Sequence, residues 1–376
     1  MLLAILFWVT AATWLAVVVA SAAGVARLPS LPAITVPVDR ASVSVIIPVR
    51  DESASLETTA DRLRQQQDVD LEMIFVNDRS VDGTGAILDR LRNDDANIRV
   101  IHIEHLPDGW IGKCHALHVG TKQARGEWIL FVDGDTWLTP GVIARAVQAA
   151  QSERADHVSL LPRQRQATLL GKAGMLILFM GMPDAMCKAN RDKAGAGLGA
   201  FNLVRAEALA AIGGHAALRM EVVDDHQLAR ALYAAGKRSR GYFAGLDVQT
   251  DLARTPGGLV RAIEKNAFSL IRYNLWIAAA FAVGLPSLLT GAVAGPIVGG
   301  VSGFAACASF LCMGLPASML ARRYQWPLLA GLLAPAGIVI VAVGGASSVL
   351  KTLARGGVRW RGDFHRLADL RKHMVR

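Results

Sequence analysis

Cysteine is scarce in this chain, and its few copies follow no recognisable spacing. The four cysteines, Cys114, Cys187, Cys307 and Cys312, form no C-x-x-C motif, and the last two lie within an apolar run. A disulfide framework or a structural zinc site would need regularly spaced pairs. The sequence therefore indicates neither, which agrees with a hydrophilic part that works in a reducing, cytosolic compartment. Internal repeats and low-complexity linkers are also missing.

Charged residues are missing from three long stretches. These stretches are Met1–Ala26, Tyr273–Ala321 and Pro327–Leu350. Each reaches the roughly 20 residues that cross a bilayer, and the middle one could hold two crossings. With 52% hydrophobic residues and a mean hydropathy of +0.34, the chain is too apolar for a purely soluble protein. The first stretch lacks a basic n-region and is longer than the apolar core of a secretory signal, so we expect a retained anchor.

Between the first two of these stretches, short apolar runs alternate with helical patterns. The expected strands are Ser42–Pro48, Leu71–Val76, Ile98–Ile103, Trp128–Val132, His157–Leu161 and Ala200–Arg205, with one or two more within Arg238–Gln249. The expected helices are Ser55–Gln66, Gly85–Leu91, Cys114–Ala124, Val142–Gln151 and Gln227–Ala235. Strands that alternate with helices of this length are typical of an α/β domain with a mostly parallel sheet.

The acidic tripeptide Asp133-Gly134-Asp135 follows the buried strand Trp128–Val132. Two carboxylates one residue apart offer hard oxygen ligands, which suit Mg²⁺ or Mn²⁺ bridging to a diphosphate. Ligands of open α/β sheets bind outside the carboxyl ends of the strands, where this pair would lie. An ordinary acidic turn is the alternative, because Asp and Gly are also common turn residues.

A second acidic pair, Asp224-Asp225, opens the expected helix Gln227–Ala235. The helix dipole favours carboxylates at this end, and one of them suffices as a cap. We expect Asp224 to be that cap, which leaves Asp225 without a structural explanation. The loop Asn77–Thr84 is also rich in polar groups that can bind a base, a ribose or a cation.

The alternation breaks between Gly171 and Gly199. Within this segment, Met175–Met182 is apolar and rich in methionine. It is either a core helix or an amphipathic element on the membrane surface beside an acceptor site, and the sequence favours neither.

Four motifs occur in order along the chain: SVIIPVRDES for the first strand and its turn, VNDRSVDGT, FVDGDT and VVDDHQLA. They resemble those of the inverting family 2 glycosyltransferases, which have a GT-A fold. Asp51 stands where Asn is usual, and Asn77 replaces the first Asp of the second motif. The resemblance covers about Ser42 to Asp251 and implies a nucleotide-sugar-binding, Rossmann-like domain with transmembrane helices on both sides.

Further features resemble lipid-directed members, namely the hopanoid-associated, carotenoid-type and ceramide-type glycosyltransferases. They are the N-terminal anchor, GWIGKCHAL before the D-x-D strand, and VRWRGDFH near the C-terminus. The Q-x-x-R-W motif of processive synthases is missing, and Arg261–Asn266 occupies that region. This departure argues against a polymerising synthase. Trp360 and Arg361 are a possible substitute as pyrophosphate contacts, with a membrane-interface anchor as the alternative.

The resemblance assigns roles residue by residue. Asp225, with Asp224 beside it, would be the catalytic base, and Asp135 with Asp133 would hold Mg²⁺ or Mn²⁺. The nucleotide-sugar-binding residues would be Pro48, Glu52, Asp78, Lys113, Asp133 and Asp135. The implied partners are a nucleotide-sugar donor, a lipid acceptor and the membrane, and no nucleic acid. A polyprenyl-phosphate sugar synthase, a polysaccharide-type synthase and a non-catalytic membrane scaffold are the alternatives.

Two other enzyme classes fit less well. A phosphatase of the haloacid dehalogenase type also has a D-x-D strand, but needs Thr or Val where Trp137 stands. A nucleotidyltransferase would have a basic, glycine-rich loop after the first strand, whereas PVRDES is acidic and lacks glycine.

The expected organisation has five parts. They are an anchor (1–26), a GT-A domain (41–255), an interfacial amphipathic segment (256–272), two or three transmembrane helices (273–350) and a basic tail (351–376). Nucleotide sugars are cytosolic, so we expect a multi-pass protein of the inner cell membrane with a cytosolic domain and the N-terminus outside. If Tyr273–Ala321 crosses twice, Pro327–Leu350 carries the tail outside. If one half of Tyr273–Ala321 is re-entrant or lies in the interface, the tail returns to the cytosol, and we expect the cytosolic tail.

Overall fold

The computed structural model describes residues 1–33 and 40–374, so the last two residues of the expected basic tail lie outside the described residues. The chain divides into two compact units. One unit, here called the helical unit, consists of Met1–Leu28, Arg165–Asp184 and Leu252–Leu367. The other, the sheet unit, consists of Pro29–Gln164, Ala185–Asp251 and Ala368–Arg376. The chain passes between the two units several times, and we describe each unit by itself.

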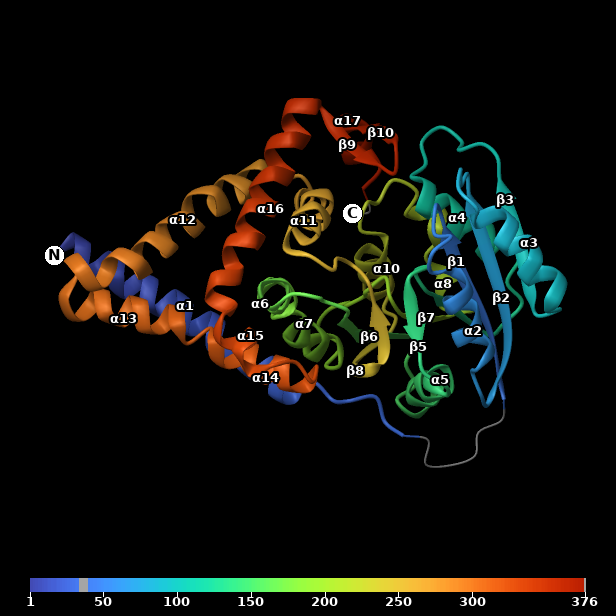
Figure 1. The fold of residues 1–376 in the computed structure, drawn as a ribbon, viewed down its shortest axis with the longest axis horizontal. Helices are drawn as coiled ribbons and strands as arrows, with labels where there is room; N and C mark the ends of the chain where they lie inside the picture. Colours follow the sequence, from blue (N-terminus) through green and yellow to red (C-terminus); the bar gives the residue numbers. More distant parts are fainter. Residues whose placement is uncertain (34–39, 375–376) are drawn as a thin grey trace. The chain divides into compact units, whose positions relative to one another are not determined.

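The sheet unit is built on eight strands in the order β3-β2-β1-β4-β7-β6-β8-β5 (Figure 1). Their bounds are β1 Ala41–Val49, β2 Val69–Asp78, β3 Ile98–Ile103, β4 Trp128–Phe131, β5 Thr136–Leu138, β6 His157–Gln164, β7 Asn202–Arg205 and β8 Ser239–Thr250. β1 pairs in parallel with β2 and β4, β2 with β3, and β6 with β8. The expected mostly parallel sheet is therefore confirmed. β7 runs antiparallel to both of its neighbours, and β5 runs antiparallel to β8.

Helices cover both faces of this sheet. Their bounds are α2 Leu56–Arg64, α3 Thr84–Asp94, α4 Gly112–Thr121, α5 Val142–Ser152, α8 Ala206–Ala211, α9 Gly214–Ala217 and α10 Asp224–Ala234. Side chains of a strand alternate between the two faces. Val45 and Ile47 of β1 thus pack in one buried cluster with residues of α2, α3 and α5. Ile46 packs in the other cluster, with residues of α4, α8 and α10. A strand that is buried on both faces explains why its sequence is almost continuously apolar.

The helical unit contains a bundle formed by α1, α12, α13 and α14. Their bounds are α1 Leu2–Arg27, α12 Leu275–Val298, α13 Gly300–Leu311 and α14 Gly314–Arg323. Small residues let the helices approach closely: a Cβ on Gly295 would lie 2.7 Å from the backbone of Gly303. Trp14 donates an indole hydrogen bond to the carbonyl of Leu288 (3.4 Å). Close packing at small residues is typical of helices in a membrane.

The rest of the helical unit consists of α6 Leu169–Phe179, α11 Pro256–Leu270, α15 Leu328–Leu332, α16 Ala334–Arg355 and the hairpin β9 Gly357–Trp360 and β10 Asp363–Arg366. α7 Met182–Ala189 and α17 Leu367–Lys372 each extend across the division between the units. Five helical stretches of the described residues are long and apolar enough to cross a membrane. They are Leu2–Arg27, Leu169–Ala189, Leu275–Val298, Gly300–Arg323 and Ala334–Arg355.

Candidate functional site

Three expected donor-site residues lie where parallel strands of the sheet end. Pro48 is near the end of β1, Asp78 is the last residue of β2, and Asp133 follows β4 by two positions. Because β2, β1 and β4 are adjacent and parallel, the three residues lie at one edge of the sheet. The fold thus brings together positions that are up to 85 residues apart, at the edge where open α/β sheets bind ligands.

Lys113 is the only described basic residue whose ion pairs join the two acidic motifs. It lies in the first turn of α4, and its ammonium is 2.7 Å from Asp133 Oδ1 and 3.5 Å from Asp224 Oδ1. Burial alone would lower the pKa of Lys113, but the carboxylates of Asp133, Asp224 and Asp225 outweigh it and raise that pKa. Lys113 is therefore a permanent cation that compensates part of the negative charge at this edge of the sheet.

Asp224 and Asp225 occupy the first turn of α10, which begins at Asp224. The expectation that Asp224 caps this helix is wrong. Val223 occupies the N-cap position of α10, and no described side chain forms a capping hydrogen bond there. The Asp224 carboxylate faces Lys113 instead. Burial raises the pKa of Asp224 to about 7; Lys113 opposes this shift, and the carboxylates of Asp225 and Asp133 add to it.

The Asp225 carboxylate is fixed by two backbone N–H groups. Gly199 donates to Oδ2 (2.6 Å) and His226 donates to Oδ1 (2.8 Å). Gly199 also adjoins the D-x-D motif, because a Cβ at this position would lie 2.7 Å from Asp133 Oδ2. The loop before β7 therefore holds Asp225 at a defined place next to Lys113 and Asp133.

These residues line a small cavity. Its lining consists of Pro48, Lys113, Leu117, Phe131, Val132, Asp133, Gly199, Asn202, His215, Asp224, Asp225 and Leu228. Apolar side chains and a few convergent charged groups are typical of a ligand site. The cavity unites three of the four motifs of the sequence, because Pro48 belongs to the first, Asp133 to the third, and Asp224 and Asp225 to the fourth.

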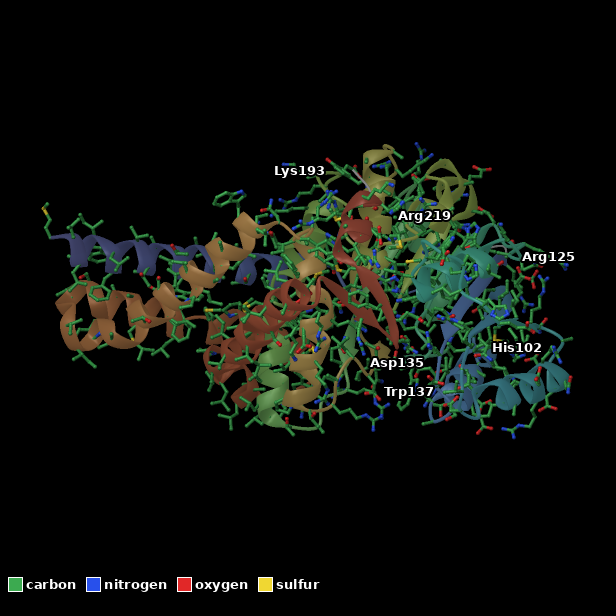
Figure 2. All side chains as sticks on the ribbon, turned by 90° about the horizontal axis from the view of Figure 1, so that it is seen from above. His102, Arg125, Asp135, Trp137, Lys193 and Arg219 are labelled. Carbon is green, nitrogen blue, oxygen red and sulfur yellow. The ribbon has the colours of Figure 1, made fainter. Side chains whose placement is uncertain are left out.

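Asp135 lies between β4 and β5, and Thr250 Oγ1 donates to its Oδ1 (3.4 Å). Figure 2 shows Asp135 next to Trp137 and well apart from His102. Burial raises the pKa of Asp135 to about 7, and the carboxylates of Asp133, Glu52 and Asp251 add to the shift. Several negative groups therefore converge on one partly buried carboxyl group.

A divalent cation fits this donor set. Hard carboxylate oxygens are the ligands that Mg²⁺ and Mn²⁺ prefer, and a cation would offset the repulsion felt by Asp135. In the described part of the chain, no group of three or more His, Cys, Asp or Glu side chains is arranged to hold a metal ion. Mg²⁺ commonly takes only one or two carboxylates and completes its shell with substrate phosphates and water. Asp133 and Asp135 supply two such carboxylates.

The loops that follow β1 and β2 are joined by hydrogen bonds; Glu52 lies in the first, and Asp78 directly precedes the second. The Asp51 backbone N–H donates to Ser80 Oγ (3.0 Å), and the Glu52 N–H donates to Thr84 Oγ1 (2.9 Å). Asp78 is 4% exposed, and its carboxylate accepts from Arg79 Nε (2.7 Å). The polar loop expected after the second strand is therefore a fixed structure beside the D-x-D edge.

Trp360 and Arg361 belong to the helical unit, at the end of β9 and in the turn after it. The Lys265 ammonium lies 3.9 Å from the centre of the Trp360 ring, which is a cation–π contact. Trp360 is only 7% exposed. Its contact with a pyrophosphate stays a prediction.

Sequence reasoning missed the network that supports the loop before β7. His157 is fully buried, and its two ring nitrogens contact Ser239 Oγ and Asn202 Oδ1, each at 3.1 Å. Asn202 Nδ2 donates to the carbonyl of Leu198 (2.8 Å), one residue before Gly199. The alternating glycines of the segment GAGLG were the available signal, since a glycine before a strand often marks a close backbone approach.

Comparisons with known proteins agree with this geometry. Residues 44–225 match the family model described as Glycosyl transferase family 2. The chain is similar to "Uncharacterized glycosyltransferase EpsJ" of Bacillus subtilis (strain 168), with 36% identity over 116 residues, which are 31% of this chain and 32% of that protein. It is also similar to the "GalNAc(5)-diNAcBac-PP-undecaprenol beta-1,3-glucosyltransferase" of Campylobacter jejuni, with 31% identity over 116 residues, which are 31% of this chain and 36% of that protein.

Two longer matches follow. The "Undecaprenyl-phosphate 4-deoxy-4-formamido-L-arabinose transferase" of Yersinia pestis (strain Pestoides F) is 30% identical over 154 residues, which are 40% of this chain and 46% of that protein. The matches thus span about a third to a half of these relatives. The "Mannosyltransferase PcManGT from Pyrobaculum calidifontis in complex with GDP-Man and Mn2+" superposes with a TM-score of 0.60 at 18% identity and covers 91% of this chain and 98% of that one. At this identity the likeness shows the fold alone.

The order of the motifs, the mixed sheet and the acidic residues at its edge agree with the matches in sequence and with the match in structure. The chain therefore carries a region, residues 44–225, that is similar to glycosyl transferase family 2, in a sheet unit with a GT-A fold.

Proposed function

We propose that this protein is a membrane-bound inverting glycosyltransferase that moves a sugar from a nucleotide-sugar donor to a hydroxyl group of a lipid acceptor. The observation that carries the proposal is the cluster of Lys113, Asp133, Asp224 and Asp225 around one cavity. It lies in a family 2 domain, and the same chain has helices long enough to cross a membrane. Since nucleotide sugars are cytosolic, the sheet unit faces the cytosol at the inner cell membrane.

The donor occupies the edge formed by β2, β1 and β4. Glu52 and Asp78 contact the base and ribose, and Pro48 lines the cavity. Asp133 and Asp135 would hold Mg²⁺ or Mn²⁺, which would supply positive charge to offset that of the departing nucleoside diphosphate. Lys113 keeps the two acidic motifs close to one another, because its ammonium pairs with Asp133 and Asp224.

The acceptor hydroxyl loses its proton to Asp225 during the transfer. A hydroxyl group is a poor nucleophile until a base takes its proton in the transition state. Asp225 is suited to this role because two N–H groups fix its orientation at the wall of the cavity. One displacement on the side opposite the leaving diphosphate inverts the anomeric centre. The bond to the acceptor oxygen forms as the bond to the diphosphate oxygen breaks.

The relatives' names raise a second candidate, a polyprenyl-phosphate sugar synthase. The Yersinia protein is named as an undecaprenyl-phosphate transferase. A lipid phosphate is already an anion, needs no base and would be repelled by carboxylates. The cavity holds Asp133, Asp224 and Asp225 against the single ammonium of Lys113. This balance of charge favours a neutral hydroxyl acceptor.

Lipid analysis tests the proposal. Extracts of cells with the gene, without it, and with only the Asp225→Asn variant are compared by mass spectrometry. We expect a glycolipid that requires the wild-type gene and a matching unglycosylated lipid that accumulates in the other two strains. Identical lipid profiles in the three strains would contradict a lipid acceptor. A product linked through a phosphate would favour the second candidate.

A further inference from the structure

The apolar helix α16 is long enough to cross a bilayer. However, its first and last turns both lie at the same end of the bundle formed by α1, α12, α13 and α14. We define the near end of the bundle by Arg27, Arg323 and Asn274, and the far end by Met1 and the turn between α12 and α13. Arg323 donates to the carbonyls of Val25 (2.9 Å) and Leu28 (2.8 Å), so α14 ends beside the C-terminus of α1. Gly299 lies against Phe7, so α12 ends beside the N-terminus of α1.

α16 starts at the near end. It follows α15, whose Gly331 lies against Ser318 of α14, five residues before Arg323. Further along α16, Gly337 lies against the backbone of Ala173 in α6. The first turns of α16 therefore pack on elements at the near end of the bundle.

α16 also ends at the near end. Ser348 Oγ accepts from the backbone N–H of Phe268 (3.0 Å), and the Lys351 ammonium is 2.7 Å from Glu264 Oε2. Both partners lie in α11, and the chain reaches Asn274, the cap of α12, six residues after Phe268. Figure 1 shows α16 running across the direction of α1 and α13. A helix with both ends at one end of a bundle does not cross the membrane with it.

The neighbours of α16 support the same conclusion. Gly344 packs against Ile263 and Val260 of α11, so the two helices lie side by side. α11 carries Arg261, Glu264 and Lys265. If α16 crossed the bilayer, these charges would enter the hydrocarbon layer, which is strongly unfavourable.

The outer face of α16 shows what it contacts instead. Its exposed apolar residues follow a spacing of three and four and form one stripe: Ala336, Val339, Val343, Ala346, Leu350 and Leu353. Val339, Val343 and Leu350 are 56%, 52% and 66% exposed. The opposite face is buried on α6 and α11. A one-sided apolar stripe beside basic residues is typical of a helix in the interface plane.

We propose that α16 lies in the plane of the membrane with this stripe towards the acyl chains. The chain then crosses three times, through α1, α12 and α13–α14, and its tail stays on the side of the near end. Arg27, Arg322 and Arg323 at the near end orient that end to the cytosol, because positive residues are enriched on the cytosolic side. The proposal rests on the proposed membrane location and not on sugar transfer.

Cysteine labelling in intact cells tests the number of crossings. Single cysteines are placed at Val301, which is 80% exposed at the far end, and at Met374 in the tail. The unsubstituted chain gives the background of its four cysteines. An impermeant maleimide should label Val301→Cys in intact cells and Met374→Cys only after permeabilisation. Labelling of Met374→Cys in intact cells, or protection of Val301→Cys until permeabilisation, would overturn the proposal.

Membrane depth tests the orientation of α16 directly. Nitroxide labels at Val339 and Leu350 of the full chain in phospholipid vesicles are compared with labels at Val9 and Val19 of α1. Each pair is separated by about 15 Å along its helix, at about 1.5 Å per residue. Oxygen and nickel accessibility should place the α16 pair at equal depth and the α1 pair at different depths. A depth difference in α16 as large as that in α1 would show that α16 crosses. Neither assay measures sugar transfer, so its failure is distinct from failure of the proposed function.

Discussion

In the proposed mechanism, the chemistry depends on a few acidic side chains whose charge is only partly compensated. Lys113 pairs with Asp133 and Asp224. No basic group is among the causes that shift the pKa of Asp135: burial and three carboxylates raise it, and a backbone hydrogen bond lowers it. An excess of carboxylates at one place favours the binding of a cationic ligand. Substitutions that remove one charge should therefore affect turnover far more than folding.

Asp135→Asn should lose most of the turnover while the protein still folds. Burying a neutral amide costs less than burying a carboxylate among other carboxylates, so the melting temperature should stay near that of wild type. The measurement is sugar transfer by purified protein with Mg²⁺ or Mn²⁺, together with a thermal melt. Wild type treated with excess chelator serves as the control and should regain activity on metal addition. Full activity of Asp135→Asn, or of chelated wild type, would rule out the metal role.

Asp225→Asn should reduce the turnover number by about 10²- to 10⁴-fold, the range typical of losing a general base. The amide gives up one of the two bonds from Gly199 and His226, so donor affinity is measured in parallel and should be nearly unchanged. Asp224→Asn is the matched control, because it removes the neighbouring carboxylate. A severe Asp224→Asn and a mild Asp225→Asn would show that the two roles are reversed.

His157 should make the stability of the sheet unit depend on pH. Burial lowers the pKa of His157 to about 4, so the unfolded chain binds a proton at this position below its ordinary pKa of about 6.5 while the folded chain does not. The neutral histidine therefore contributes to the free energy of unfolding above pH 6.5. This contribution, on the order of 3 kcal/mol, is lost as the pH falls from 6.5 to 4.

The comparison with His157→Gln isolates this effect, since glutamine does not titrate in this range. Thermal melts at several pH values should show wild type more stable than His157→Gln near pH 7.5, with a gap that narrows as the pH falls towards 5. Asp224 and Asp135 titrate in both proteins and cancel in the difference. A gap that stays constant with pH would contradict the prediction.

At the scale of elements, the loop before β7 connects the acidic motifs. Gly199→Ala would bring a Cβ to 2.7 Å from Asp133 Oδ2 and should displace either the loop or that carboxylate. A displacement of about 1 Å can cost on the order of 100-fold in rate. Gly181→Ala is a suitable control, because within the described residues an added Cβ there meets no atom within 4 Å. Equal turnover numbers for the two variants would show that this loop does not position the site.

The sequence predicted most elements of the sheet unit because their signals are local. β3 has the predicted bounds, and β1 and β4 differ from the apolar runs by one or two residues. β5 was missed, because its three residues form a strand only by pairing with β8. The antiparallel β7 was not predictable either, since its direction depends on where the long excursion through α6 and α7 returns the chain.

The candidate site was predictable in composition but not in geometry. The motifs named Asp133, Asp135, Asp224 and Asp225, yet the start of α10 was placed three residues too late, and the capping role of Asp224 was wrong. The Lys113–Asp133 pair joins residues on different elements, so no spacing in the sequence reveals it. Gly199 and Asn202 were missed because their contacts exist only in the folded chain.

At the scale of the whole molecule, hydropathy found the apolar helices but not their directions. α1 and α16 have similar length and are both apolar enough to cross a membrane. Only the packing of α16 on α6 and α11 distinguishes it from a crossing helix. Hydropathy alone would place the tail outside the cell, whereas the packing supports a tail on the side of the near end.

Sugar transfer by the purified full chain tests the central claim most directly. The protein is placed in nanodiscs with a total lipid extract and supplied with Mn²⁺ or Mg²⁺ and a panel of radiolabelled nucleotide sugars. Wild type should transfer label from one donor into the lipid fraction, and Asp225→Asn should transfer at least about 100-fold less while it still binds that donor. Equal transfer by the two proteins, or a panel in which no donor labels the lipid fraction, would contradict the account.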